Sequence, residues 1–212
     1  MPRYFAVGDI HGHYIKLKKL LNCLDWKPNS DDLLIFLGDY IDRGPDSYQV
    51  VSRLVTLAKK ASNVIPLLGN HEDDLLQIIK NKFIEERNYR NGIQATIESY
   101  HKHHYEIYNL PQRHLAFLNQ LLPYYETEKY IFVHAGLMPG VPLAHQNLED
   151  LLWVRDEFFR SNYDFGKLVV FGHTPFRKPF LTDRYLGIDT GAAYGKSLTC
   201  VVLPEMEFIA ID

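Results

Sequence analysis

The chain has 212 residues, and its 23 Lys and Arg residues against 26 Asp and Glu residues give a net charge of -3. This balance provides no basic field of the kind that binds polymeric nucleic acid or an anionic membrane surface. The longest apolar runs have the length of a strand, and Asp9 leaves no room for a secretory signal before it. We therefore expect one cytoplasmic domain over residues 1–212, without a membrane partner.

The first third of the chain has the pattern of a parallel βαβαβ unit. Three short apolar runs, Tyr4–Val7, Leu33–Leu37 and Val64–Leu68, each end at a glycine and lead towards a segment with helical spacing. In sheets of this kind ligands gather at the carboxyl ends of the strands. The polar residues that follow these runs are therefore expected to meet at one edge of the sheet.

The chain changes character between about residues 73 and 122, where it is rich in tyrosine and charge and has helical spacing. We interpret this segment as a helical insertion beside the site. Strand-like runs return at Tyr130–Val133, Leu168–Phe171, Leu198–Leu203 and Glu207–Ile211. Because few helical segments separate them, we expect the second half to form a largely antiparallel sheet packed on the first.

Five short polar blocks follow the apolar runs: Gly8-Asp9-Ile10-His11-Gly12, Gly38-Asp39-Tyr40-Ile41-Asp42-Arg43-Gly44, Gly69-Asn70-His71-Glu72, His134-Ala135-Gly136 and Gly172-His173. Their carboxylate, imidazole and amide groups are ligands for hard or borderline divalent metals. Asp9 and His11 project to the same side if the strand geometry continues past Asp9. Asp39 can bridge two cations, because Gly38 permits close approach and a carboxylate has two oxygens. The blocks therefore predict a two-metal site.

The content and order of these blocks resemble the phosphoprotein phosphatase branch of the calcineurin-like metallophosphoesterases, with most similarity to the bacterial and phage serine/threonine protein phosphatases. The resemblance spans residues 8 to 200. It implies an α/β sandwich of two mixed β-sheets flanked by helices. It also implies a bridging role for Asp39 and a set of six metal ligands: Asp9, His11, Asp39, Asn70, His134 and His173. Manganese is the metal that the resemblance suggests, and the ligand types also suit iron or zinc.

The charge count of this site favours an anionic substrate. Two divalent cations bring four positive charges, of which Asp9, Asp39 and a bridging hydroxide remove three. We expect hydrolysis of a phosphate ester by direct attack of the hydroxide that bridges the two metals. No cysteine nucleophile motif is present, so a covalent phosphoenzyme is not required.

His71 directly follows Asn70, so its side chain should leave the turn in another direction, towards the leaving oxygen, as a general acid. The resemblance implies that Asp42 hydrogen-bonds this histidine and that Arg43 and Arg155 hold phosphate oxygens. An ordinary polar turn at Asp42 and a surface ion pair of Arg155 with Asp156 or Glu157 are the alternatives.

The leading hypothesis is a metal-dependent phosphomonoesterase of the serine/threonine protein phosphatase type. Leu68 departs from that pattern, because many protein phosphatases have an arginine at this position and the related dinucleoside tetraphosphatases have a leucine. A diadenosine tetraphosphate hydrolase is therefore the alternative. A catalytically silent phosphate-binding module is a second alternative, against which the complete ligand set argues. The expected partner is a phosphorylated protein, a small phosphoester or a nucleotide.

Overall fold

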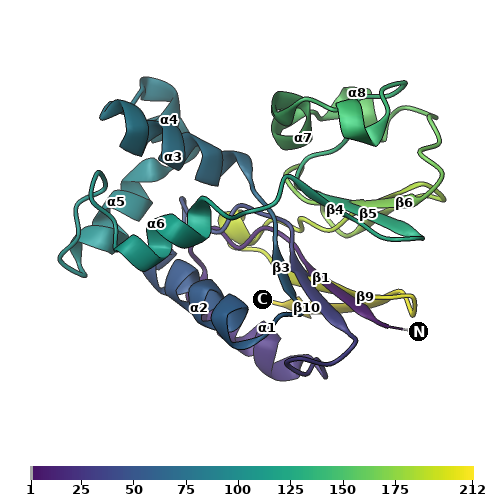
Figure 1. Cartoon of the computed structure of the whole chain (residues 1–212), viewed down its shortest axis with the longest axis horizontal. Helices are drawn as coiled ribbons and strands as arrows, with labels where there is room; N and C mark the ends of the chain where they lie inside the picture. The colour runs from purple at the N-terminus through teal and green to yellow at the C-terminus, as the bar shows by residue number, and fades with distance from the viewer. Residues whose placement is uncertain (1) are drawn as a thin grey trace.

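Two five-stranded β-sheets form the centre of the computed structural model, which describes residues 2–212 (Figure 1). The first sheet has the order β10 (Glu207–Ile211), β9 (Leu198–Leu203), β1 (Tyr4–Val7), β2 (Leu33–Phe36) and β3 (Val64–Pro66). Strands β1, β2 and β3 are parallel, and β9 is antiparallel to both of its neighbours. Helices α1 (Tyr14–Cys23) and α2 (Ser47–Lys60) connect the parallel strands, so the predicted βαβαβ unit is confirmed.

The second sheet has the order β4 (Tyr124–Glu126), β5 (Tyr130–Val133), β6 (Leu168–Phe171), β8 (Tyr185–Gly187) and β7 (Phe180–Leu181). Its three central strands are parallel, and only the two edge strands are antiparallel. The prediction of a largely antiparallel second half is therefore wrong. It fails because β9 and β10 return to the first sheet and leave a parallel centre behind. The two mixed sheets flanked by helices that the resemblance implies are confirmed.

The helices lie on the outer faces of the two sheets. Between β3 and β4 the chain forms α3 (Asn70–Asn81), α4 (Glu86–Asn91), α5 (Ile93–His101) and α6 (Gln112–Leu118), where the helical insertion is predicted. Helices α7 (Leu148–Trp153) and α8 (Asp156–Phe159) lie over the second sheet, and short 3₁₀ turns occur at Leu143–His145 and Ala192–Tyr194. Within residues 2–212, no helix has the length and apolar content needed to cross a membrane.

The alternation of side chains along the strands explains the layers. Phe5 and Val7 of β1 are buried in the apolar cluster that includes α1 and α2, whereas Ala6 is buried in a second cluster with Ile35 of the same sheet and Phe132 of the other. Successive strand residues face opposite sides of a sheet, so β1 is apolar on both. The result is a sandwich in which the sheets pack on each other and the helices cover the outside.

Candidate metal centre

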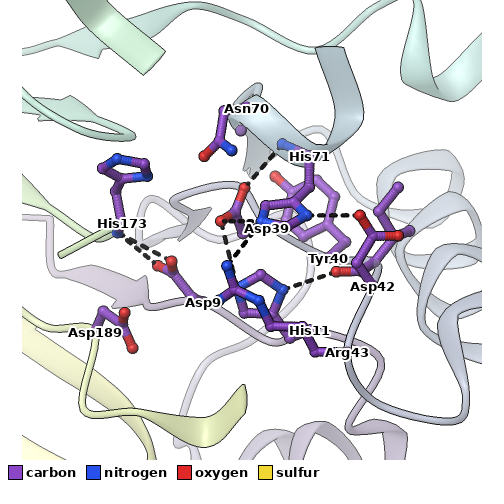
Figure 2. Close-up of polar contacts among 12 residues, drawn as sticks. Asp9, His11, Asp39, Tyr40, Asp42, Arg43, Asn70, His71, His173 and Asp189 are labelled. Carbon is purple, nitrogen blue, oxygen red and sulfur yellow. Dashed lines mark hydrogen bonds and ion pairs between the residues drawn. The ribbon is translucent and has the colours of Figure 1, made fainter. Parts of the chain in front are cut away.

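The carboxyl ends of six parallel strands meet in one place, and each strand is followed by a buried polar residue. These residues are Asp9 after β1, Asp39 after β2, Asn70 after β3, His134 after β5, His173 after β6 and Asp189 after β8. Figure 2 shows five of them gathered around one region. The strand ends of both sheets thus build a single site, as expected for ligands of parallel sheets.

Tight turns set the directions in which the side chains of the site point. His11, Asp39, Asp42, Arg43 and His173 all have positive φ angles, between 45° and 68°. The condition that strand geometry continues from Asp9 to His11 is not met, because β1 ends at Val7 and His11 has a φ of 45°. The turn nevertheless brings His11 Nε2 to 3.4 Å from Asp39 Oδ2. Each such residue costs of order 1–3 kcal/mol, so the surrounding structure has to hold it in place.

Glu72 holds the turn that carries Asp39. Its fully buried carboxylate accepts hydrogen bonds from the backbone N–H groups of Asp39 and Tyr40, both at 2.8 Å, Gly69 at 3.2 Å and Ile41 at 3.3 Å. Burial, together with the nearby charge of Asp39, raises the pKa of Glu72 to about 8. This side chain therefore ties the loop after β2 to the start of α3.

Asp39 lies at the centre of the site among three imidazoles. Its carboxylate oxygens are 3.3 Å from Nε2 of His134, 3.4 Å from Nε2 of His11 and 3.7 Å from Nε2 of His71. Burial alone would raise the pKa of Asp39, but these imidazoles outweigh it and hold the pKa well below its usual range. Asp39 is therefore an ionised carboxylate with one oxygen towards each half of the site.

The half of the site around His134 has the donor set of a metal site. His134 Nδ1–H donates to the carbonyl of Leu37 at 2.8 Å, and burial lowers the pKa of this imidazole. Its Nε2 therefore carries a lone pair, which faces Asn70 Oδ1 at 2.9 Å and Asp39 Oδ1 at 3.3 Å. His173 Nε2 is buried and has no hydrogen-bond partner within residues 2–212. Converging lone pairs with no proton between them fit a cation.

The other half contains His11, Asp39 and His71, whose ligand atoms lie within 4.8 Å of one another. His11 Nδ1–H donates to the carbonyl of Ile41 at 2.8 Å, which leaves a lone pair on Nε2. This lone pair accepts a hydrogen bond from Arg43 Nη1 at 3.0 Å. One lone pair cannot serve two cations, so a metal ion bound at His11 would displace the guanidinium from it.

Asp9 and Asp189 add negative charge beside Asp39. The Asp9 carboxylate accepts a hydrogen bond from the backbone N–H of His173 at 3.0 Å. Burial, and then the charges of Asp189 and Asp39, raise the pKa of Asp9 well above its usual range, and burial also raises that of Asp189. Crowded buried carboxylates of this kind are stabilised by divalent cations. The residues present therefore fit two metal ions.

Asp42 and His71 form the pair that the resemblance implies. Asp42 Oδ2 accepts a hydrogen bond from His71 Nδ1–H at 2.6 Å (Figure 2). Asp42 Oδ1 accepts one from the Thr96 hydroxyl at 2.6 Å. Burial lowers the pKa of His71, but Asp39 and Asp42 outweigh it and raise the pKa to about 9. Thr96 belongs to α5, so the helical insertion fixes this pair from outside the sheets.

The two arginines differ in position. Arg43 is partly buried, and its Nη2 lies 3.2 Å from His71 Nε2. Arg155 is exposed at the edge of the site and donates to the carbonyl of His173 and the hydroxyl of Thr174, both at 3.3 Å. Within residues 2–212 Arg155 forms no ion pair with Asp156 or Glu157, and Asp156 pairs with Arg160 instead.

Sequence reasoning missed Asp189 and Thr96. The signal for Asp189 was the apolar run Tyr185-Leu186-Gly187-Ile188 before it, but β8 itself has only three residues. Thr96 carries no such signal, because its partner Asp42 is 54 residues away in the chain. All eight predicted metal-ligating and catalytic side chains are nevertheless buried in this one region.

The fold and the site define a metallophosphoesterase, and the comparison with protein families agrees. The family model of the calcineurin-like phosphoesterases matches residues 2–200, so the chain belongs to this family. It is a hydrolase of the metallophosphoesterase type, a class that implies divalent metal ions.

Individual proteins within this family can also be compared with the chain. The asymmetrical bis(5′-nucleosyl)-tetraphosphatase PrpE of Halalkalibacterium halodurans is 29% identical over 99% of this chain and 93% of its own. The enzyme of the same name from Oceanobacillus iheyensis is 28% identical over 97% and 90%. A crystal structure of a candidate diadenosine tetraphosphatase superposes with a TM-score of 0.77 at 24% identity, covering 100% of this chain and 95% of that one. The two relatives from Halalkalibacterium and Oceanobacillus are named as nucleotide tetraphosphatases, whereas the leading hypothesis from the sequence is a protein phosphatase.

Proposed function

We propose that this protein hydrolyses dinucleoside tetraphosphates asymmetrically, releasing a nucleoside triphosphate and a nucleoside monophosphate. The observation that carries the proposal is the match to tetraphosphatases over nearly the whole length of both chains, which includes the segments that build the site. We therefore prefer the alternative drawn from the sequence to the protein phosphatase hypothesis. Leu68 is consistent with it, because this side chain is buried in the apolar cluster beneath the helices and supplies no charge to the substrate.

Six residues are proposed as the metal ligands: Asp9, His11, Asp39, Asn70, His134 and His173. Divalent ions held there would supply Lewis-acid activation of water and neutralise phosphate charge. Manganese is the proposed ion, because carboxylate, amide oxygen and imidazole together suit it. Asp39 is proposed to bridge, since its two oxygens face the two groups of imidazoles.

Side chains of the site would bind the substrate phosphates and protonate the leaving oxygen. The anhydride P–O bond breaks as the water oxygen bonds to phosphorus, and the departing phosphate takes the bonding electron pair. The attacking water releases a proton to solvent, and His71 regains from solvent the proton that it donates. We assign His71 as the residue that protonates this oxygen and Asp42 as the residue that fixes the imidazole through Nδ1. Arg43 would hold phosphate oxygens from inside the site, and Arg155 would do so from its edge.

A comparison of substrates tests the proposal. The metal-loaded protein is assayed with diadenosine tetraphosphate and with a set of phosphoserine and phosphothreonine peptides, and the products are separated by ion-exchange chromatography. We expect ATP and AMP in equal amounts, with a kcat/KM at least about tenfold above that of the best peptide, a difference of about 1.4 kcal/mol in transition-state binding. A peptide that is cleaved tenfold better than the nucleotide would restore the protein phosphatase hypothesis.

A further inference from the structure

A cavity of about 300 Å³ lies beside the metal centre, between α3, α4 and α7. Asp73 and Asp74 line it from α3, Arg87 from α4, and Leu152 and Trp153 from α7. In Figure 1, α3 and α4 lie at the upper left and α7 lies to their right. The volume is at the lower end of the range of small-molecule sites.

The cavity is close to the reacting groups. Helix α3 starts with Asn70 and His71, so Asp73 and Asp74 lie one helical turn further along it, about 5 Å away along the axis. On the opposite wall, the Trp153 ring is 5.9 Å from the His173 ring, edge to face. A molecule whose phosphate reached the metal centre would therefore have its next group in this cavity.

The wall of the cavity carries net negative charge. Asp73, Asp74 and Glu149 line it, and Arg87 is the cation among these lining residues. Arg87 is already engaged, because its Nη2 pairs with Asp74 Oδ1 at 3.1 Å and its Nε with Glu85 Oε2 at 2.6 Å. The cavity therefore disfavours a phosphate and favours an uncharged group.

We propose that this cavity binds the purine base of the nucleotide half next to the attacked phosphate. The inference rests on the proposed function and names its base-binding site. Trp153 is partly exposed and offers a flat aromatic ring against which a purine can stack. The phosphates would be repelled by Asp73, Asp74 and Glu149 and remain at the metal centre. The base, and not the polyphosphate, fits this charge pattern.

Binding of AMP and ribose 5-phosphate to the metal-loaded protein tests the stacking wall, because the two ligands differ only in the base. Isothermal titration calorimetry should give a dissociation constant at least about tenfold lower for AMP. Trp153→Ala should reduce this ratio to below about threefold, and Trp153→Phe should restore most of it. Trp26→Ala is the matched control, since Trp26 packs near the amino end of β2, where its Nε1–H donates to the carbonyl of Asp32. It should keep the wild-type ratio.

Equal affinities for AMP and ribose 5-phosphate in the wild type, or a ratio that Trp153→Ala does not change, would overturn the inference while hydrolysis of diadenosine tetraphosphate still supported the proposed function. If the ratios behave as expected but the tetraphosphate is not cleaved, the proposed function fails and the base-binding site stands.

Discussion

Replacing Glu72 by Gln should loosen the site without removing any proposed metal ligand. The two oxygens of Glu72 divide four backbone donors between them: Oε1 accepts from Tyr40 and Ile41, and Oε2 accepts from Asp39 and Gly69. Glutamine has the same shape but only one acceptor oxygen. Whichever way its amide turns, the NH₂ group faces two N–H donors that then lose their partner.

The loss can be estimated from these contacts. At pH 9, above the pKa of about 8, Glu72 is ionised, and a hydrogen bond to a charged group contributes about 1.5–3 kcal/mol, so two of them amount to about 3–6 kcal/mol. Domains are stable by only about 5–15 kcal/mol, and each kcal/mol shifts Tm by about 2–4 °C at this chain length. We therefore expect Glu72→Gln to lower Tm by roughly 10 °C and to weaken metal binding, because the turn that holds Asp39 in its positive φ is released.

Thermal and urea unfolding of the metal-loaded proteins measure the effect, and isothermal titration with Mn²⁺ measures the binding. Glu98→Gln is the matched control, since Glu98 is exposed on α5 and its neutralisation should change stability by less than about 0.5 kcal/mol. A Tm for Glu72→Gln within 2 °C of the wild type would refute the argument that this carboxylate supports the turn.

Three further predictions follow from single side chains. Asp39→Asn should lower the metal content measured by plasma mass spectrometry from two ions per chain and remove most activity, whereas two tightly held ions with wild-type turnover would contradict a bridging role. His71→Asn should slow substrates with a basic leaving oxygen by about 10²–10⁴ and nucleotide anhydrides much less, because a departing phosphate has a pKa near 6, so an equal loss on both would remove the general acid. Burial lowers the pKa of His114 to about 4 in the folded protein, whereas the same imidazole in the unfolded chain has its usual pKa of 6.5. Between these two pH values the unfolded chain binds one more proton than the folded protein. Up to about 3 kcal/mol of stability should therefore be lost as pH falls from about 6.5 to 4. Urea unfolding of His114→Gln should lack this loss, and identical pH profiles would show that His114 is not its source.

The order of the polar blocks was enough to predict the family, the two mixed sheets and the buried residues of the site. This works because a strand followed by glycine and a ligand is a local pattern, visible within a few residues of Asp9, Asp39 or Asn70. Asp42 is correctly paired with His71, although 29 residues separate them, because the resemblance supplied that contact.

The features that could not be predicted from the sequence depend on contacts between distant segments. The direction of β6 relative to β5 is set by the chain path through α7 and α8, which leaves no mark on the strand itself. Asp189 was not predicted because the strand before it, β8, has only three residues. The left-handed backbone conformation of His11 is fixed by packing and not by residue type. The cavity between Asp74 and Trp153 likewise exists only once α3 and α7 face each other.

The central claim is that six side chains from both sheets hold two metal ions around Asp39. Anomalous diffraction from crystals grown with Mn²⁺ tests it most directly. The account predicts two peaks, one contacted by Asp9, His11 and Asp39, and the other by Asp39 together with the remaining three ligands, Asn70, His134 and His173. A single peak, or two peaks that do not share Asp39, would contradict it.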